Sequence, residues 1–150
     1  MAIAIKDKDS KQVENRKEGL TNKYIEEFGL KHCKDFLGVF PSDIQPVVKN
    51  LKSFSIIFNE SEHDEEGSHF VCVFLKNGKC YYFDSLGLKL ENENIITFLK
   101  KYINVKVIEN NIQIQSFESL FCGYYCLSFL IFLSKGFDIR KYFKNLIKKI

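Results

Sequence analysis

Apolar residues in this chain gather in a few short runs, and the spacing within each run predicts its structure. The clearest runs are His69–Leu75 and Cys80–Asp84, which are nearly continuous in apolar residues and flank Asn77-Gly78. Asn-Gly is the preferred pair for a tight type I′ turn, so we expect an antiparallel hairpin. Because neither run alternates with polar residues, the hairpin should be central in its sheet and covered on both faces.

The longest apolar run extends from Leu120 to Leu133 and predicts a buried helix. It is shorter than the roughly 20 residues that a bilayer-spanning helix needs, so a core position is favoured over a membrane one. Gly136 is expected to end this helix. Asp138 is expected to cap a basic C-terminal helix over residues 139–150.

The remaining patterns predict smaller elements around these two. They are helices over 22–28, ended by Gly29, and over 92–102, capped by Asn92 or Asn94; strands over 53–58, 105–109 and 112–115; and a loop with buried aromatics over 34–46. Together they predict an α+β fold in which a mostly antiparallel sheet packs on the central helix. Residues 1–20 are charged and predict a flexible arm, which leaves a single domain over 21–150.

Composition narrows the classes of function. The chain has 150 residues with 45% hydrophobic and 27% charged content, which is ordinary for a globular domain, and its net charge of +3 gives no bulk argument for nucleic-acid binding. Its five cysteines form neither paired CxxC motifs nor a Cys/His zinc pattern, so no metal is expected. The N-terminus lacks the apolar core of a signal peptide, and we expect a reducing compartment rather than secretion.

Cys122 is the leading candidate for chemistry. It opens the apolar helix, where free backbone N–H groups favour a thiolate, and Gly123 beside it leaves room for a substrate backbone to approach. The alternative is that Cys122 is a small buried hydrophobe, which is our interpretation of Cys72, Cys80 and Cys126. Taken alone, Cys122 fits both interpretations equally well.

The hairpin register supplies a base and an acid. With Asn77-Gly78 as the central turn residues, Val71 lies opposite Asp84. Side chains two apart on a strand share a face, so His69 and Asp84 should be diagonal neighbours. A carboxylate there can accept a hydrogen bond from the ring and stabilise an imidazolium. Without that partner, His69 would be an ordinary half-buried surface histidine.

Gln115 is a candidate oxyanion donor. It ends the predicted strand just before the loop that leads to Cys122, so its amide could donate to a developing oxyanion beside the Cys122 N–H. Gln113 shares its strand face and is the competing candidate. Both could also be ordinary solvent-facing polar residues.

The order of these residues resembles that of the adenovirus-type endoproteases (adenains), within the wider clan of Ulp1-like deSUMOylating proteases. The matching segments are Gly67-Ser68-His69-Phe70, Tyr82-Phe83-Asp84-Ser85-Leu86-Gly87, Phe36-Leu37-Gly38-Val39-Phe40, and Gln115 seven residues before Cys122-Gly123. The segment from Cys122 to Leu127 is similar to versions carried by Maverick/Polinton elements and virophages. The resemblance covers roughly residues 24–133.

This resemblance implies a papain-like α+β fold in which the histidine precedes the cysteine, and it implies a role for each candidate. Cys122 would be the nucleophile, His69 the general base and Asp84 the orienting acid. Gln115 and the Cys122 N–H would form the oxyanion hole. Phe70 stands where the family has a tryptophan, and we expect it to contact substrate together with Gly123.

The implied function is that of a viral cysteine endopeptidase that cleaves capsid or virion precursor proteins during maturation, through an acyl-enzyme. We expect a monomer that acts in the host cytoplasm or nucleus and in the virion, away from membranes. Two alternatives stay open: a deubiquitinating or deSUMOylating isopeptidase of the same clan, and a non-catalytic capsid or DNA-binding protein on this fold.

No tightly held cofactor is expected. Adenoviral members use a peptide activator joined through a cysteine ahead of the glutamine motif, and they use DNA. This chain has no cysteine between Cys80 and Cys122, which argues against that covalent link. The basic residues after Lys135 predict at most weak DNA binding, because an exposed basic helix face is usually only solvated.

Overall fold

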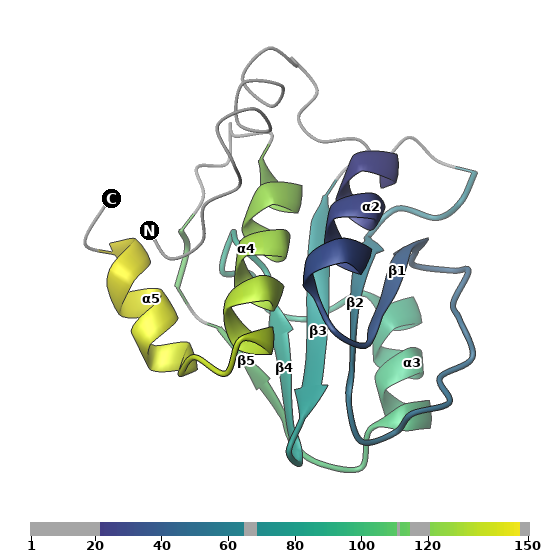
Figure 1. The fold of residues 1–150 in the computed structure, drawn as a ribbon. Helices are drawn as coiled ribbons and strands as arrows, with labels where there is room; N and C mark the ends of the chain where they lie inside the picture. Colours follow the sequence, from purple (N-terminus) through teal and green to yellow (C-terminus); the bar gives the residue numbers. More distant parts are fainter. Residues whose placement is uncertain (1–21, 65–68, 111, 115–120, 148–150) are drawn as a thin grey trace.

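The computed structural model of the chain describes residues 22–64, 69–110, 112–114 and 121–147. In chain order the elements are α2 (Asn22–His32), β1 (Phe36–Pro41), β2 (Phe54–Asn59), β3 (Phe70–Lys76), β4 (Lys79–Phe83), α3 (Glu93–Tyr102), β5 (Val107–Glu109), α4 (Cys122–Ser134) and α5 (Ile139–Ile147) (Figure 1). The predicted arm over 1–20 lies outside the described residues, and the division into arm and domain stays a prediction.

The five strands form one sheet in the order β1-β2-β3-β4-β5. Strand β3 pairs antiparallel with β2 and with β4, whereas the outer pairs β1–β2 and β4–β5 are parallel. The α+β class is therefore correct, but the prediction of a mostly antiparallel sheet is wrong, because the sheet is mixed. The connection from β4 to β5 runs through α3, and such a crossover brings the chain back in the same direction.

The β3–β4 hairpin has the predicted register. Lys76 pairs with Lys79 and Cys72 with Phe83. Asn77 has a φ of 54° and Gly78 a φ of 74°, and both central residues of a type I′ turn need such positive values. The turn thereby brings the start of β3 beside the end of β4.

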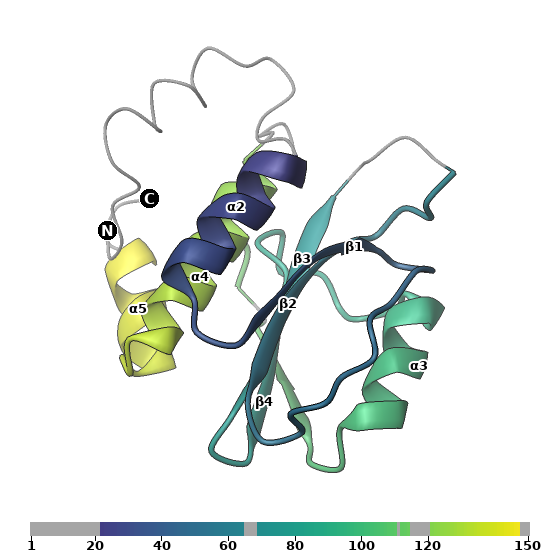
Figure 2. The same cartoon turned by 45° about the vertical axis from the view of Figure 1, so that its right-hand side comes forward.

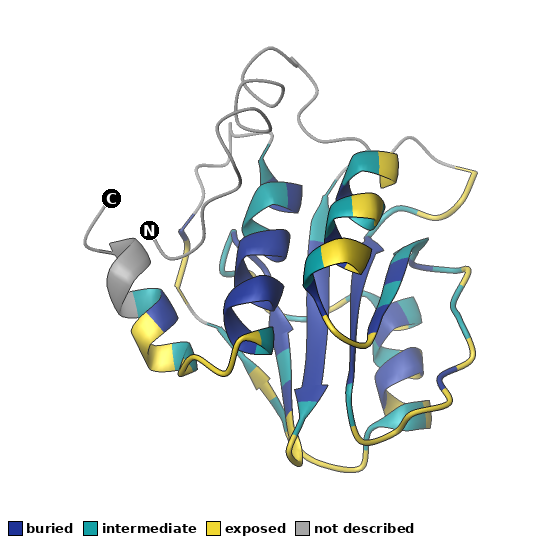
Figure 3. Ribbon diagram, in the orientation of Figure 1, coloured by how far each residue is buried: buried dark blue, intermediate teal, exposed yellow. Residues whose placement is uncertain are grey.

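Helices cover both faces of this sheet, so β3 is buried on both sides as predicted (Figures 2 and 3). Cys72 and Phe74 face a core cluster that includes residues of α2 and α4. Val71 and Val73 face the opposite cluster, which includes residues of α3. The apolar run of β3 therefore lacks alternation because both of its faces are core.

Helix α4 is the buried helix that the longest apolar run predicted. It begins at Cys122 and packs against β3 and α2, and nearly all of its residues are buried. Rings of Phe129 and Phe83 stack with centroids 4.3 Å apart. Gly136 follows its end with a φ of 86°, and Asp138 Oδ1 accepts a hydrogen bond from the Arg140 N–H at 2.7 Å, as expected for a cap of α5. No helix within the described ranges combines the length and the apolar character needed to cross a membrane.

Three of the smaller predictions hold to within one or two residues at their starting points. Asn92 caps α3, because its side chain accepts hydrogen bonds from the N–H groups of Asn94 and Ile95. Strand β2 begins at Phe54, one residue after the predicted start. Strand β5 begins at Val107, because residues 105 and 106 do not pair with β4.

Three other predictions are wrong, each because a distant segment decides the local structure. Helix α2 continues past Gly29 to His32, since Gly29 is buried where the Phe36 ring takes the space of a side chain. Residues 36–41 form β1 rather than a loop, because they pair with β2. Residues 112–114 are not a strand; the Ile114 N–H instead donates to the Ser85 carbonyl at 2.9 Å.

Candidate active site

Three chain segments bring His69, Asp84 and Cys122 together where β3 begins and β4 ends. His69 immediately precedes β3, and Asp84 immediately follows β4, so the hairpin register places them side by side. Cys122 is the first residue of α4, which packs against β3. All three residues thus sit at the end of a regular element that contributes residues to the core.

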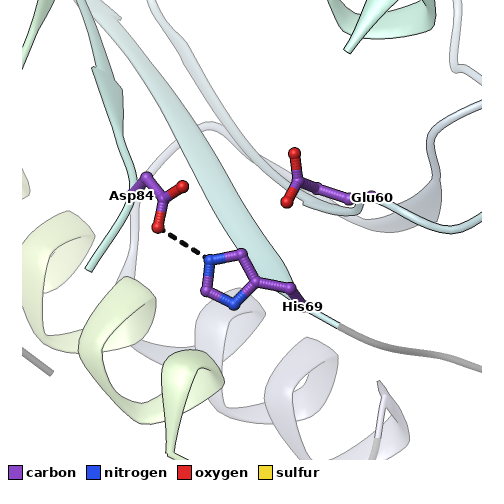
Figure 4. A group of neighbouring side chains, drawn as sticks. All are labelled: Glu60, His69 and Asp84. Carbon is purple, nitrogen blue, oxygen red and sulfur yellow. Dashed lines mark hydrogen bonds and ion pairs between the residues drawn. The ribbon is translucent and has the colours of Figure 1, made fainter. Parts of the chain in front are cut away.

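The His69 ring is bonded to the Asp84 carboxylate, as the register predicted (Figure 4). Nε2 of His69 lies 2.7 Å from Oδ1 of Asp84, and the side chains are 14% and 2% exposed. The same Oδ1 accepts the Leu86 N–H at 2.8 Å. A carboxylate held in this way fixes the orientation of the ring and leaves Nδ1 as the nitrogen available to a further partner.

Asn110 fixes the backbone of Asp84 and was not identified from the sequence. Its Oδ1 accepts the Asp84 N–H at 2.9 Å, and its Nδ2 donates to the Asp84 carbonyl at 2.7 Å. Two hydrogen bonds from one amide side chain hold that peptide segment in a single position. An asparagine after a short strand carries no local signal for such a role, because the contact joins residues 26 apart.

The Cys122 thiol lies against the start of β3. Its Sγ accepts a hydrogen bond from the Phe70 N–H at 3.4 Å, and the residue is 6% exposed. The thiol also interacts with the His69 ring. As the first residue of α4, Cys122 is in the turn whose backbone N–H groups lack partners within the helix, a position that favours a negative charge.

The site strongly favours protonated His69. Burial acts to lower the pKa of His69, but hydrogen bonds to Asp84 and Cys122, together with the attraction of their charges, outweigh burial and raise the pKa to about 10. An imidazolium beside a thiol is the arrangement that activates a cysteine nucleophile.

Three of the other four cysteines have surroundings that suppress the thiolate. All of them are buried and free. Burial raises the pKa of Cys33 and of Cys80 to about 12, and it raises the pKa of Cys126 as well. Of the five cysteines, Cys122 alone combines a helix N-terminus with the His69 ring, although its catalytic role stays a prediction.

The two residues predicted to contact substrate differ in their surroundings. Phe70 is half-buried beside the core cluster, and its backbone reaches the thiol. A Cβ on Gly123 would lie 2.5 Å from Cδ1 of Ile25 in α2. The space of a Gly123 side chain is therefore taken by Ile25, so the glycine allows close packing of α2 on α4, and its contact with substrate stays a prediction.

Gln115, the predicted oxyanion donor, lies outside the described residues, as do Gly67 and Ser68 of the histidine motif. Its competitor Gln113 is exposed and packs beside Gly87, in the turn that follows Asp84. The choice of Gln115 therefore rests on its spacing from Cys122.

Glu60 lies beside His69 and Asp84 and was not predicted from the sequence. It follows β2, and its N–H donates to the His69 carbonyl at 2.9 Å, so it is the cross-strand neighbour of the histidine. Ligand atoms of Glu60, His69 and Asp84 all lie within 4.8 Å of one another (Figure 4). These three residues are the ones that could hold a metal ion within the described segments, but Nε2 of His69 and Oδ1 of Asp84 already bond to each other.

Comparison with known proteins agrees with this geometry. No protein-family model matches the chain. The chain is 28% identical to the "Putative thiol protease R355" of Acanthamoeba polyphaga mimivirus, over 67% of this chain and 41% of that protein. It therefore spans less than half the length of this curated relative.

Two solved structures share the fold. The crystal structure of the ASFV pS273R protease matches with a TM-score of 0.57 and 18% identity, over 82% of this chain and 60% of that one. The SUMO protease Ulp1, in a structure whose catalytic cysteine is oxidised to a sulfinic acid, matches with a TM-score of 0.51 and 14% identity, over 97% and 93%. The predicted resemblance to viral and Ulp1-like cysteine proteases is confirmed in the fold that the chain shares with these two structures.

Proposed function

We propose that this chain is a viral cysteine endopeptidase with Cys122 as nucleophile, His69 as general base and Asp84 as the residue that orients the base. The observation that carries the proposal is the bond between His69 Nε2 and Asp84, which directs the other ring nitrogen to the thiol of Cys122. The thiol belongs to the first residue of a buried helix, so little movement is available to it.

The proposed reaction has two stages. The proton that Cys122 gives up is held on Nδ1 of His69, and the thiolate attacks the scissile carbonyl carbon to form a tetrahedral oxyanion. The Cys122 N–H and the side chain of Gln115 stabilise that oxyanion. His69 then gives its proton to the leaving amine, and the C–N bond breaks to leave a thioester on Cys122. Water, deprotonated by His69, hydrolyses the thioester and restores the thiol.

We propose capsid or virion precursor proteins as substrates, cleaved by a monomer in the host cell and in the virion. Similarity to a mimivirus protein described as a thiol protease, and a fold shared with an ASFV protease, support a viral setting. DNA binding through the basic residues after Lys135 would be weak and secondary.

The second candidate is an isopeptidase that acts on a ubiquitin-like modifier. The observation that favours it is the match to the SUMO protease Ulp1, which covers nearly the whole of both chains. Both functions use the same three residues, so the substrate alone separates them.

One experiment separates the candidates. The purified chain is incubated with capsid proteins of large DNA viruses and virophages, and in parallel with fluorogenic SUMO and ubiquitin substrates; new termini are then sequenced. Cleavage of a capsid protein that Cys122→Ala abolishes supports the endopeptidase. Release from the modifiers alone supports the isopeptidase. If Cys122→Ala cleaves as well as the unmodified chain, the thiol mechanism is wrong.

A further inference from the structure

Glu60 is held in place by hydrogen bonds of its main chain. Its N–H donates to the His69 carbonyl at 2.9 Å. Its carbonyl accepts from Ser42 Oγ at 2.9 Å and from Asn92 Nδ2 at 3.0 Å. These three bonds fix the backbone of Glu60 and do not involve its carboxylate. The carboxylate can therefore interact electrostatically with its neighbours.

The carboxylate points toward the ring of His69 from the side opposite to the polypeptide that carries Asp84 (Figure 4). One of its oxygens lies within 4.8 Å of the His69 and Asp84 ligand atoms. Two carboxylates, one from the residue after β2 and one from the residue after β4, thus lie close to each other and to the same ring nitrogen, while Nδ1 faces away from both (Figure 4).

The charges of these groups are coupled. Burial raises the pKa of Glu60, the charge of His69 acts to lower it, and the charge of Asp84 acts to raise it further. The attraction is mutual, so an ionised Glu60 favours the protonated form of His69 to the same extent. A protonated ring beside the two carboxylates also offsets the repulsion between them.

We propose that Glu60 is a positioning residue, a second carboxylate that acts with Asp84 to keep His69 protonated and oriented toward Cys122. It touches neither substrate nor thiol and acts only through the ring. Its effect on turnover rests on the proposed protease function, whereas its effect on the ring does not.

Several titratable groups surround this pair and must be considered in any pH experiment. His69 faces Asp84 after β4 and Cys122 on α4, and it influences Cys126 one turn further along α4. Glu60 also influences Tyr82 of β4, whose pKa burial raises far above neutrality. The groups concerned are therefore Asp84, Cys122, Cys126 and Tyr82, and a change at Glu60 leaves all four in place.

The test is an NMR titration of the His69 ring in the full chain, assigned with His69→Asn. Glu60→Gln removes the charge with little change of shape and keeps all three main-chain bonds. It should lower the pKa of His69 by about one unit, the lower end of the effect of an opposite charge within 4–6 Å. Glu60→Asp keeps the charge and should recover part of that shift. Glu62→Gln is the matched control, because it removes the same charge from an exposed position two residues away, and it should leave His69 unchanged.

Activity provides a second measurement. Glu60→Gln should move the alkaline limb of the pH profile of kcat about one unit lower with little change in KM, and it should move the pH dependence of Cys122 alkylation by iodoacetamide in the same direction. An unchanged His69 pKa in a folded Glu60→Gln chain overturns the proposal, even if the chain cleaves proteins. If that variant does not fold, the unmodified chain provides the test: the His69 resonances must move when Glu60 takes up a proton at acid pH. The absence of such movement would also overturn the proposal. If the pKa shifts but no substrate is ever cleaved, the protease function fails and the proposal for the ring stands.

Discussion

The His69–Asp84 bond makes a quantitative prediction about stability and pH. In the unfolded chain the histidine has a pKa near 6.5, and in the folded chain about 10. Folding therefore favours the proton on His69. The stabilisation is fully present below about pH 6.5 and is lost as the pH rises toward 10. A rise from 6.5 to about 10 corresponds to at most about 5 kcal/mol, and little of this is screened because the ring is 14% exposed.

The perturbation is Asp84→Asn, which removes the charge and keeps the shape. At pH 6 the variant should be less stable than the unmodified chain by about 3–5 kcal/mol, since breaking a buried pair leaves the other charge uncompensated. At pH 10 the difference should shrink to about 1 kcal/mol, the value of an ordinary hydrogen bond. Urea unfolding at five pH values between 6 and 10 measures both curves. Cysteine, tyrosine and lysine titrations are common to the two chains and cancel in the difference.

The matched control is the pair formed by His63 and Asp43, which are also bonded, but on the surface. The pKa of His63 is raised by its hydrogen bond with Asp43. Because solvent screens this pair, Asp43→Asn should produce a much smaller pH-dependent difference in stability than Asp84→Asn. A difference for Asp84→Asn that stays constant from pH 6 to pH 10 would refute the reasoning, because it would mean that Asp84 does not raise the pKa of His69.

Three further predictions concern single residues. Limiting iodoacetamide at neutral pH should label Cys122 before the other cysteines, as peptide mass spectrometry would reveal; equal labelling of a second thiol would contradict its activation. Asn110→Ala should lower kcat about tenfold with KM unchanged, through loss of the two bonds that hold Asp84, and an unchanged kcat would remove Asn110 from the site. Gly123→Ala should destabilise the chain by about 1–3 kcal/mol in urea unfolding, because its methyl would meet Ile25, and the double variant with Ile25→Val should recover part of the loss; no recovery would place the strain elsewhere.

The parts of the fold that the sequence predicted are those that neighbouring residues determine. The Asn77-Gly78 turn sets its own register, and that register alone placed Asp84 beside His69. The β1 segment could not be found in the same way. Its six residues look like a loop until β2 lies alongside, and no local pattern specifies a parallel partner.

The same distinction explains which site residues were missed. Glu60 faces His69 because β2 and β3 pair, but the sequence between those strands is long and polar and has no Asn-Gly-type signal that would predict a register. Asn110 reaches Asp84 only after the chain has passed through α3 and β5. At Gly29 the sequence predicted a local role where the structure has a tertiary one. Glycine typically ends a helix, but here the lack of a side chain leaves space for the ring of Phe36.

The position of Cys122 at the start of α4 has a consequence for how the chain is synthesised. The hairpin that joins His69 and Asp84 is local and can form as soon as it leaves the ribosome, whereas the nucleophile is translated almost forty residues later. The thiol reaches the ring only when α4 docks on β3. A nascent chain therefore carries its base and acid without a nucleophile, and the proposed activity begins only when the last large part of the core has closed.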